Sequence, residues 1–348
     1  MMADFLSNDM SDLVHHIHNF QVEVSVDEML DIDSGLDRVL EAISTRTWLN
    51  MLSWTSIPLN TAWRLVEILA SERINRFRLT YLTRLPYTLI TSRRSIQFLE
   101  ATHISFSTNS RPSPDMHALT QIHHLDVFPN LSDFNLSIGS AISVMERLDT
   151  YLGCPDDISA FLEMVQRMPG SLSSVSLLLN DYDTFLENAL TNAKQLFPLL
   201  SVREVTFVCG PAAFMALPAL SPIVYFLQRV INPTPVEMIT IRFVIALEEE
   251  LLAVFLPSQD EGLSYLGRNI LLDSFPSLRR IDFELFISIQ TEEDSQRTRS
   301  ATEETEACFE SNIMSLFIPH DCCAASDIAR VTERVEVTVK IIKCQRRR

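Results

Sequence analysis

Two short stretches of the chain combine residue types that could carry catalysis or bind an ion. The segment Gly262 to Gly267, GLSYLG, exceeds the G-x-S-x-G nucleophile elbow by one residue, and it lies in a predicted helical stretch rather than after a strand. The acidic segment Asp31 to Gly35 suggests a calcium loop, but with Gly35 in the sixth position the first ligand would be the apolar Leu30. Helix capping explains this acidic segment better, and neither stretch predicts an active site.

The histidines and cysteines are similarly uninformative. His16 and His18 would share one face of a strand, but no carboxylate or cysteine stands at a convincing second ligand spacing, and the same holds for the histidines between residues 117 and 124. The six cysteines contain no C-x-x-C pair, and the vicinal Cys322 and Cys323 are expected to be buried thiols. We therefore expect no enzyme activity and no catalytic, metal or cofactor site.

Composition narrows the classes of partner. The net charge is −17, from 45 acidic and 28 basic residues, so nucleic acid and anionic membranes are poor partners. Only seven glycines are present, and no phosphate-cradling loop is found. The uncharged stretch 205–228 is long enough to span a bilayer, but one Gly and three Pro interrupt it. The first residues lack a signal-peptide pattern, so a cytoplasmic or nuclear protein is expected.

The clearest structural pattern is the segment Phe275 to Ser288, FPSLRRIDFELFIS. After a Pro, Ile281, Phe283 and Leu285 alternate with Asp282 and Glu284, which is strand periodicity with one solvated face. Leu278, Ile281 and Phe283 also have the spacing h-x-x-h-x-h, where h is an apolar residue. This spacing returns along the chain and predicts a repeated strand.

The predicted units begin about 33 residues apart on average, which lies within the range of repeat proteins. Their first apolar positions are 17, 49, 74, 96 or 99, 131, 172, 202, 236 and 278, and a last strand is expected over 335–341. Amphipathic helices follow several of them, for example one that begins near Asp156 and Asp157. A strand followed by a helix, repeated, implies a parallel sheet with right-handed crossovers. The expected fold is α/β, an open parallel sheet of about nine or ten strand–helix units in a right-handed solenoid.

One unit carries a recognisable motif. Leu172, Val175, Leu177 and Asn180 match the leucine-rich-repeat signature L-x-x-L-x-L-x-x-N in full, whereas other residues take the Asn position elsewhere. The irregular units, with Pro before the strand and long helical returns, resemble the C-terminal repeat regions of fungal F-box proteins. That resemblance implies recruitment of a substrate to a ubiquitin ligase. No F-box is recognised in this chain, so ligase docking is not carried over to any residue.

In such a stacked sheet the residues between the core positions line an open, concave face. That face is expected to bind a protein or peptide, and to change from basic near the third unit to acidic near the ninth. The basic block 46–111, with nine Arg and three Glu, is the candidate for meeting an acidic partner, and the alternative is an ordinary solvated surface that offsets acidic neighbours. The expected partner-binding residues are Arg76, Arg78, Asn135, Ser176, Arg242, Asp282 and Glu284.

The expected organisation is an N-terminal extension (1–16), one repeat domain (17–345) and a basic tail (346–348). The polar segment 291–306 is expected to be a disordered acidic loop. The protein is expected to be a monomer on its own. Two alternatives stay open: an α/β enzyme whose site is not visible as a motif, and a fragment of a larger protein that carries its activity elsewhere.

Overall fold

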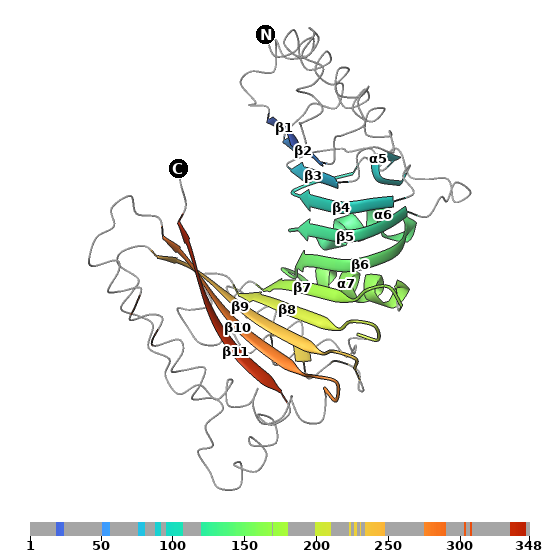
Figure 1. Ribbon diagram of the computed structural model, residues 1–348. Helices are drawn as coiled ribbons and strands as arrows, with labels where there is room; N and C mark the ends of the chain where they lie inside the picture. Colours follow the sequence, from blue (N-terminus) through green and yellow to red (C-terminus); the bar gives the residue numbers. More distant parts are fainter. Residues whose placement is uncertain are drawn as a thin grey trace, which may run out of the picture. The chain divides into compact units, whose positions relative to one another are not determined.

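The fold is taken from a computed structural model of the chain (Figure 1). The residues described are 19–23, 51–55, 76–80, 88–91, 95–106, 120–168, 170–179, 199–209, 223, 226, 227, 230, 234–247, 275–289, 303, 307 and 335–345. The side chains of 19–23, 51–55, 140, 245–247, 288, 289 and 343–345 are not described. The contacts divide the chain into two compact units, Met1–Thr150 (unit 1) and Tyr151–Arg348 (unit 2).

Unit 1 contains a parallel sheet in which each strand pairs with its neighbours in sequence. Its strands are β1 (Asn19–Glu23), β2 (Met51–Thr55), β3 (Arg76–Thr80), β4 (Ser95–Thr102), β5 (Thr120–Phe128) and β6 (Ile142–Tyr151). Its helices are α5 (Thr88–Thr91), α6 (Leu131–Ile138) and the short 3-10 helix η3 (Gly139–Ala141). Helix α6 contacts β5, and the ring of its buried residue Phe134 lies 5.9 Å from that of Phe106, which follows β4.

Unit 2 repeats the parallel arrangement, and its last three strands have 10 residues each. Its elements are α7 (Pro155–Arg167), β7 (Ser174–Leu179), β8 (Glu204–Cys209), β9 (Met238–Leu247), β10 (Arg280–Ile289) and β11 (Glu336–Gln345). Helix α7 begins with Pro155 in its first turn, beside two aspartates that favour a helix N-terminus. The helix predicted near Asp156 and Asp157 is therefore confirmed.

The α/β fold with open parallel sheets is thus confirmed. In unit 2 the three apolar positions of the h-x-x-h-x-h spacing face the core, as expected. They are at most 3% exposed in four successive repeats. These positions are Leu172, Val175 and Leu177; Val202, Val205 and Phe207; Val236, Ile239 and Ile241; and Leu278, Ile281 and Phe283. The second and third positions of each repeat stack in register on those of the next.

The strand predicted from Leu131, Phe134 and Leu136 is wrong, because these residues form helix α6. The spacing i, i+3, i+5 fits a strand, but on a helix it places the first two residues on one face and the third away from it. Accordingly Leu131 and Phe134 are buried, and Leu136 is 76% exposed. Strands β5 and β6 lie on either side of α6 in sequence, and neither was predicted.

Several predictions lie outside the described residues. These are the N-terminal extension 1–16, the basic tail 346–348, the motif residue Asn180, and the segments 31–35, 262–267 and 322–323. The segment 291–306 also lies outside them except for Glu303, which is helical and exposed. The single repeat domain over 17–345 stays a prediction.

Candidate binding surface

One face of the unit 1 sheet carries the side chains that alternate with the buried core residues. The strand register places them in two rows that run across β3, β4, β5 and β6. The first row is Arg76, Phe98, His124 and Arg147. The second row is Arg78, Glu100, Asp126 and Asp149. The first row has cations and rings and no carboxylate, whereas the second has three carboxylates and one guanidinium.

The first row is held together by ring contacts. The guanidinium of Arg76 lies 5.6 Å from the centroid of the Phe98 ring, within the range of a cation–π interaction. On the other side of Phe98, the His124 ring approaches edge-on with 4.8 Å between centroids. Phe98 is therefore sandwiched between a cation and an imidazole, and the three side chains form a continuous surface.

In the second row the two outer carboxylates have partners within the sheet. Glu100 pairs with Arg78, with 2.5 Å between Oε2 and Nε. Asp149 accepts hydrogen bonds from Arg147, at 2.9 Å from Nε, and lies 3.0 Å from Nε2 of His124. Burial by itself would raise the pKa of Asp149, but these two partners outweigh it, and the pKa is lowered. Asp149 is thus ionised and compensated.

Asp126, between these two carboxylates, is different. Among the residues that the structure describes, no side chain forms a hydrogen bond or ion pair with it. Burial, and then repulsion from Asp149 and Glu100, raise its pKa from 3.8 to about 6, although His124 and Arg147 act in the opposite direction. Asp126 is therefore the uncompensated charge of the second row.

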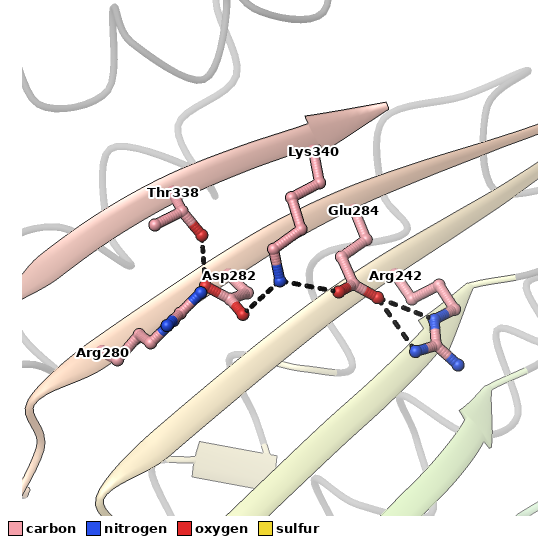
Figure 2. A network of polar contacts seen from close by, with 6 residues as sticks. All are labelled: Arg242, Arg280, Asp282, Glu284, Thr338 and Lys340. Carbon is pink, nitrogen blue, oxygen red and sulfur yellow. Dashed lines mark hydrogen bonds and ion pairs between the residues drawn. The ribbon is translucent and has the colours of Figure 1, made fainter. Parts of the chain in front are cut away.

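The corresponding face of unit 2 carries an ion network across β9, β10 and β11 (Figure 2). Asp282 on β10 accepts from Nε of Arg280 at 2.7 Å and from Nζ of Lys340 at 2.8 Å. The hydroxyl of Thr338 donates to the same carboxylate. Burial would raise the pKa of Asp282, but hydrogen bonds from Arg280, Lys340 and Thr338 outweigh it, so the pKa is lowered.

Glu284, two residues further along β10, continues the network. Its Oε2 accepts from Nη2 of Arg242 at 2.9 Å and from Nε at 3.1 Å, and its Oε1 lies 3.2 Å from Nζ of Lys340. The Arg242 guanidinium also lies 4.9 Å from the centroid of the Phe286 ring. Lys340 therefore joins the two carboxylates, and the network as a whole holds three cations against two anions (Figure 2).

Asp282 and Glu284 were predicted to be an exposed acidic pair, and this is wrong. Asp282 is only 4% exposed and Glu284 8%. The cause is the strand register, which places Thr338 and Lys340 of β11 beside them on one side and Thr240 and Arg242 of β9 on the other. The long cationic side chains cover and neutralise the carboxylates, so these two residues do not form an acidic end of the face.

The other predicted site residues divide as follows. Arg78 on β3, Ser176 on β7 and Arg242 on β9 each lie between two buried neighbours, as expected. Arg76 begins β3 and precedes the buried Phe77. Asn135 lies on helix α6 and is only 5% exposed, so its predicted place on the sheet face is wrong.

Sequence reasoning missed the part of the surface that lies on β5 and β6. A signal for β5 was present, because Ile122, Leu125 and Val127 have the same h-x-x-h-x-h spacing and are at most 2% exposed. The competing match at residues 131–136 obscured it. With β5 recognised, the alternation would have placed His124 and Asp126 on the polar face.

The described residues offer no metal site, because no group of three or more His, Cys, Asp and Glu among them is arranged for an ion. Cys154 and Cys209 are free thiols, and burial together with Asp157 raises the pKa of Cys154. No helix in the described part of the chain has the length and apolar character needed to cross a membrane. No model of a known protein family matches the chain, and no curated protein matches it.

Proposed function

We propose that this protein is a recognition module, an irregular leucine-rich-repeat-like solenoid that binds a protein or peptide partner on the polar face of its sheet. The observation that carries the proposal is the alignment of charged and aromatic side chains into rows across neighbouring parallel strands. Parallel strands lie about 4.8 Å apart, so a row of four side chains spans roughly 14 Å. A surface of this length suits a polypeptide better than a small molecule.

The repeated backbone geometry supports a solenoid. Before β8, the amides of Arg203 and Glu204 both donate to the carbonyl of Ser173, at 2.8 and 3.1 Å. One turn later the amides of Glu237 and Met238 donate in the same way to the carbonyl of Arg203. Arg279 and Arg280 repeat the arrangement on Glu237. Each turn therefore starts its strand from the preceding turn, as stacked repeats do.

The charge on the surface supports a polypeptide partner with both signs of charge. The chain as a whole is strongly acidic, but the two rows of unit 1 contain three Arg and three carboxylates. A polyanion would meet no excess of positive charge there. Complementary charges then contribute specificity, while the partly buried ring of Phe98 in the first row contributes apolar contact.

Affinity purification of the full chain with quantitative mass spectrometry tests this function. We expect Arg76→Glu to lower the recovery of specific partners several-fold, because the reversed charge lies on the first row. Arg167→Glu is the matched control, since it makes the same change on helix α7 of unit 2, outside the two rows. Equal recovery with wild type and Arg76→Glu, or equal losses with both variants, would contradict the proposal.

The resemblance to F-box repeat regions adds a finer proposal, that the bound partner is a substrate for ubiquitination. It predicts that a partner recovered through the polar face has a shorter half-life in cells that contain the chain. Pulse–chase measurement of that partner with wild type and with Arg76→Glu tests it. An unchanged half-life would remove the ubiquitin-ligase role and leave the recognition function standing.

A further inference from the structure

The unit 1 face has one carboxylate that its own sheet does not compensate. Glu100 has Arg78, and Asp149 has Arg147 and His124, whereas Asp126 between them has no partner among the described side chains. Beside this carboxylate row runs a row that contains cations and rings only. The surface is therefore two parallel bands of opposite character rather than a patch of one charge.

We propose that this face docks an extended peptide segment in which a lysine stands two residues from an acidic residue. The lysine lies on Asp126 in the second row, and the acidic side chain faces the first row. This inference rests on the recognition function proposed above and names the chemistry of the partner.

The choice of lysine follows from the number and spacing of the acceptors. Glu100, Asp126 and Asp149 stand on three adjacent strands, about 4.8 Å apart. A lysine ammonium has three donors and no acceptor, so one group placed above Asp126 can donate to its carboxylate while the negative charges of Glu100 and Asp149 lie on either side. A bare metal ion is a poorer occupant, because the described groups of this face are not arranged for ion ligation. The flexible stem of lysine also lets the peptide backbone stay above the strands.

The acidic residue follows from the neighbouring row. Along β5 the two rows are separated by two residues, from His124 to Asp126, which is about 6.6 Å in a strand. In an extended peptide, side chains on one face also recur every two residues, at the same distance. A lysine over Asp126 thus places the next side chain of that face over His124, between Phe98 and Arg147. An acidic group is complementary there, as a second acceptor for Arg147 beside Asp149.

Ionisation of Asp126 gives the complex a pH dependence. Burial, Asp149 and Glu100 raise the pKa of Asp126 to about 6, against the opposing effects of His124 and Arg147. The lysine binds the ionised form, so its affinity should fall as the pH drops through about 6. A variant that lacks the Asp126 carboxylate separates this effect from any other pH-dependent change.

Fluorescence polarization with the full chain and the capped, fluorescein-labelled peptide TETKTET tests the inference. An acidic residue stands on each side of the lysine, so either direction of the peptide satisfies the pattern. We expect TETKTET to bind about tenfold more tightly than TETQTET, which lacks only the ammonium, since charge-assisted hydrogen bonds are the strong ones. We expect Asp126→Asn to remove this preference, and Glu163→Gln, the same loss of charge on helix α7, to retain it.

The outcomes separate this inference from the general function. Two results together support the inference. The preference for TETKTET must depend on Asp126, and it must weaken from pH 7.5 to pH 5 only in chains that contain Asp126. Equal binding of TETKTET and TETQTET, an unchanged preference in Asp126→Asn, or no binding of either peptide at about 1 mM overturns it. If the inference is overturned while partner recovery still depends on Arg76, the recognition function stands with a partner of other chemistry.

Discussion

Asp126→Asn should stabilise the protein at neutral pH, although most substitutions of half-buried groups destabilise. At a strand spacing of about 4.8 Å and an effective dielectric of about 20, each neighbouring carboxylate opposes ionisation by about 3 to 4 kcal/mol. Burial adds to that repulsion, whereas His124 and Arg147 oppose it. The net effect is the rise of the Asp126 pKa from 3.8 to about 6, which corresponds to about 3 kcal/mol.

The measured gain in the free energy of unfolding should be smaller than the value of about 3 kcal/mol that the pKa shift gives. Asp126 is partly solvated, which screens the charges, and the side-chain amide introduced at this position would gain no described partner. We therefore expect Asp126→Asn to raise the free energy of unfolding by about 1 to 2 kcal/mol at pH 7.5. A carboxyl whose pKa rises on folding has a cost of ionisation that is absent below about pH 4 and complete above about pH 6. The advantage of the variant should disappear by pH 4.

Urea denaturation followed by tryptophan fluorescence suits this measurement, because all three tryptophans belong to unit 1. Asp149→Asn is the matched control on the adjacent strand. The pKa of Asp149 is lowered, since its partners outweigh burial, so that variant should destabilise at pH 7.5. If Asp126→Asn destabilises at pH 7.5, or if its effect is the same at pH 4 and pH 7.5, the electrostatic account of the second row is refuted.

Four further substitutions test other parts of the structure, each by urea denaturation followed by far-UV circular dichroism. Asp282→Asn should lower the free energy of unfolding by about 1 to 3 kcal/mol. The difference in stability between wild type and variant should narrow below about pH 4, because the native carboxyl, whose pKa is lowered, becomes protonated there. A difference that does not change with pH would argue against the ion network. Phe134→Ala should lower the free energy of unfolding by about 3 to 5 kcal/mol, because Phe134 is buried, and Leu136→Ala should lower it by less than about 0.5 kcal/mol, because Leu136 is exposed. Comparable losses in the two variants would contradict helix α6. Gly153→Ala should cost about 1 to 3 kcal/mol, because a Cβ there overlaps the ring of Tyr151, and an unchanged stability would show that the ring moves aside easily.

The core of unit 2 could be predicted because its signal is local. The h-x-x-h-x-h spacing around Leu172, Val202, Val236 and Leu278 marks residues that face the same side of one strand, and no distant partner is needed to recognise it. The same spacing at Leu131 failed because three apolar residues at i, i+3 and i+5 are compatible with a strand and with a helix. Only the packing of Phe134 decides between them.

The candidate surface was less predictable because its properties depend on register. Alternation correctly placed Asp282 and Glu284 opposite the core side chains, but it gave no information about the neighbours on β9 and β11. Those neighbours are 42 to 58 residues away in sequence, and they turn an expected acidic end into a buried, compensated network. Asp126 is likewise governed by distant residues, because its pKa is raised by burial and by carboxylates on two other strands.

Within each unit, strands pair with the strands that come before and after them in the sequence. This pairing determines how freely the connections between strands can vary in length. The pair Arg78–Glu100 closes a loop of 22 residues, and the pair Thr338–Asp282 closes one of 56. Closure entropy grows only with the logarithm of length, so the longer connection costs about 0.8 kcal/mol more than the shorter. Such a small difference lets connections between strands lengthen or shorten while the sheet register stays the same. The irregular spacing of the strands is therefore thermodynamically inexpensive, and evolution can change what surrounds the sheet without losing the rows of side chains that it aligns.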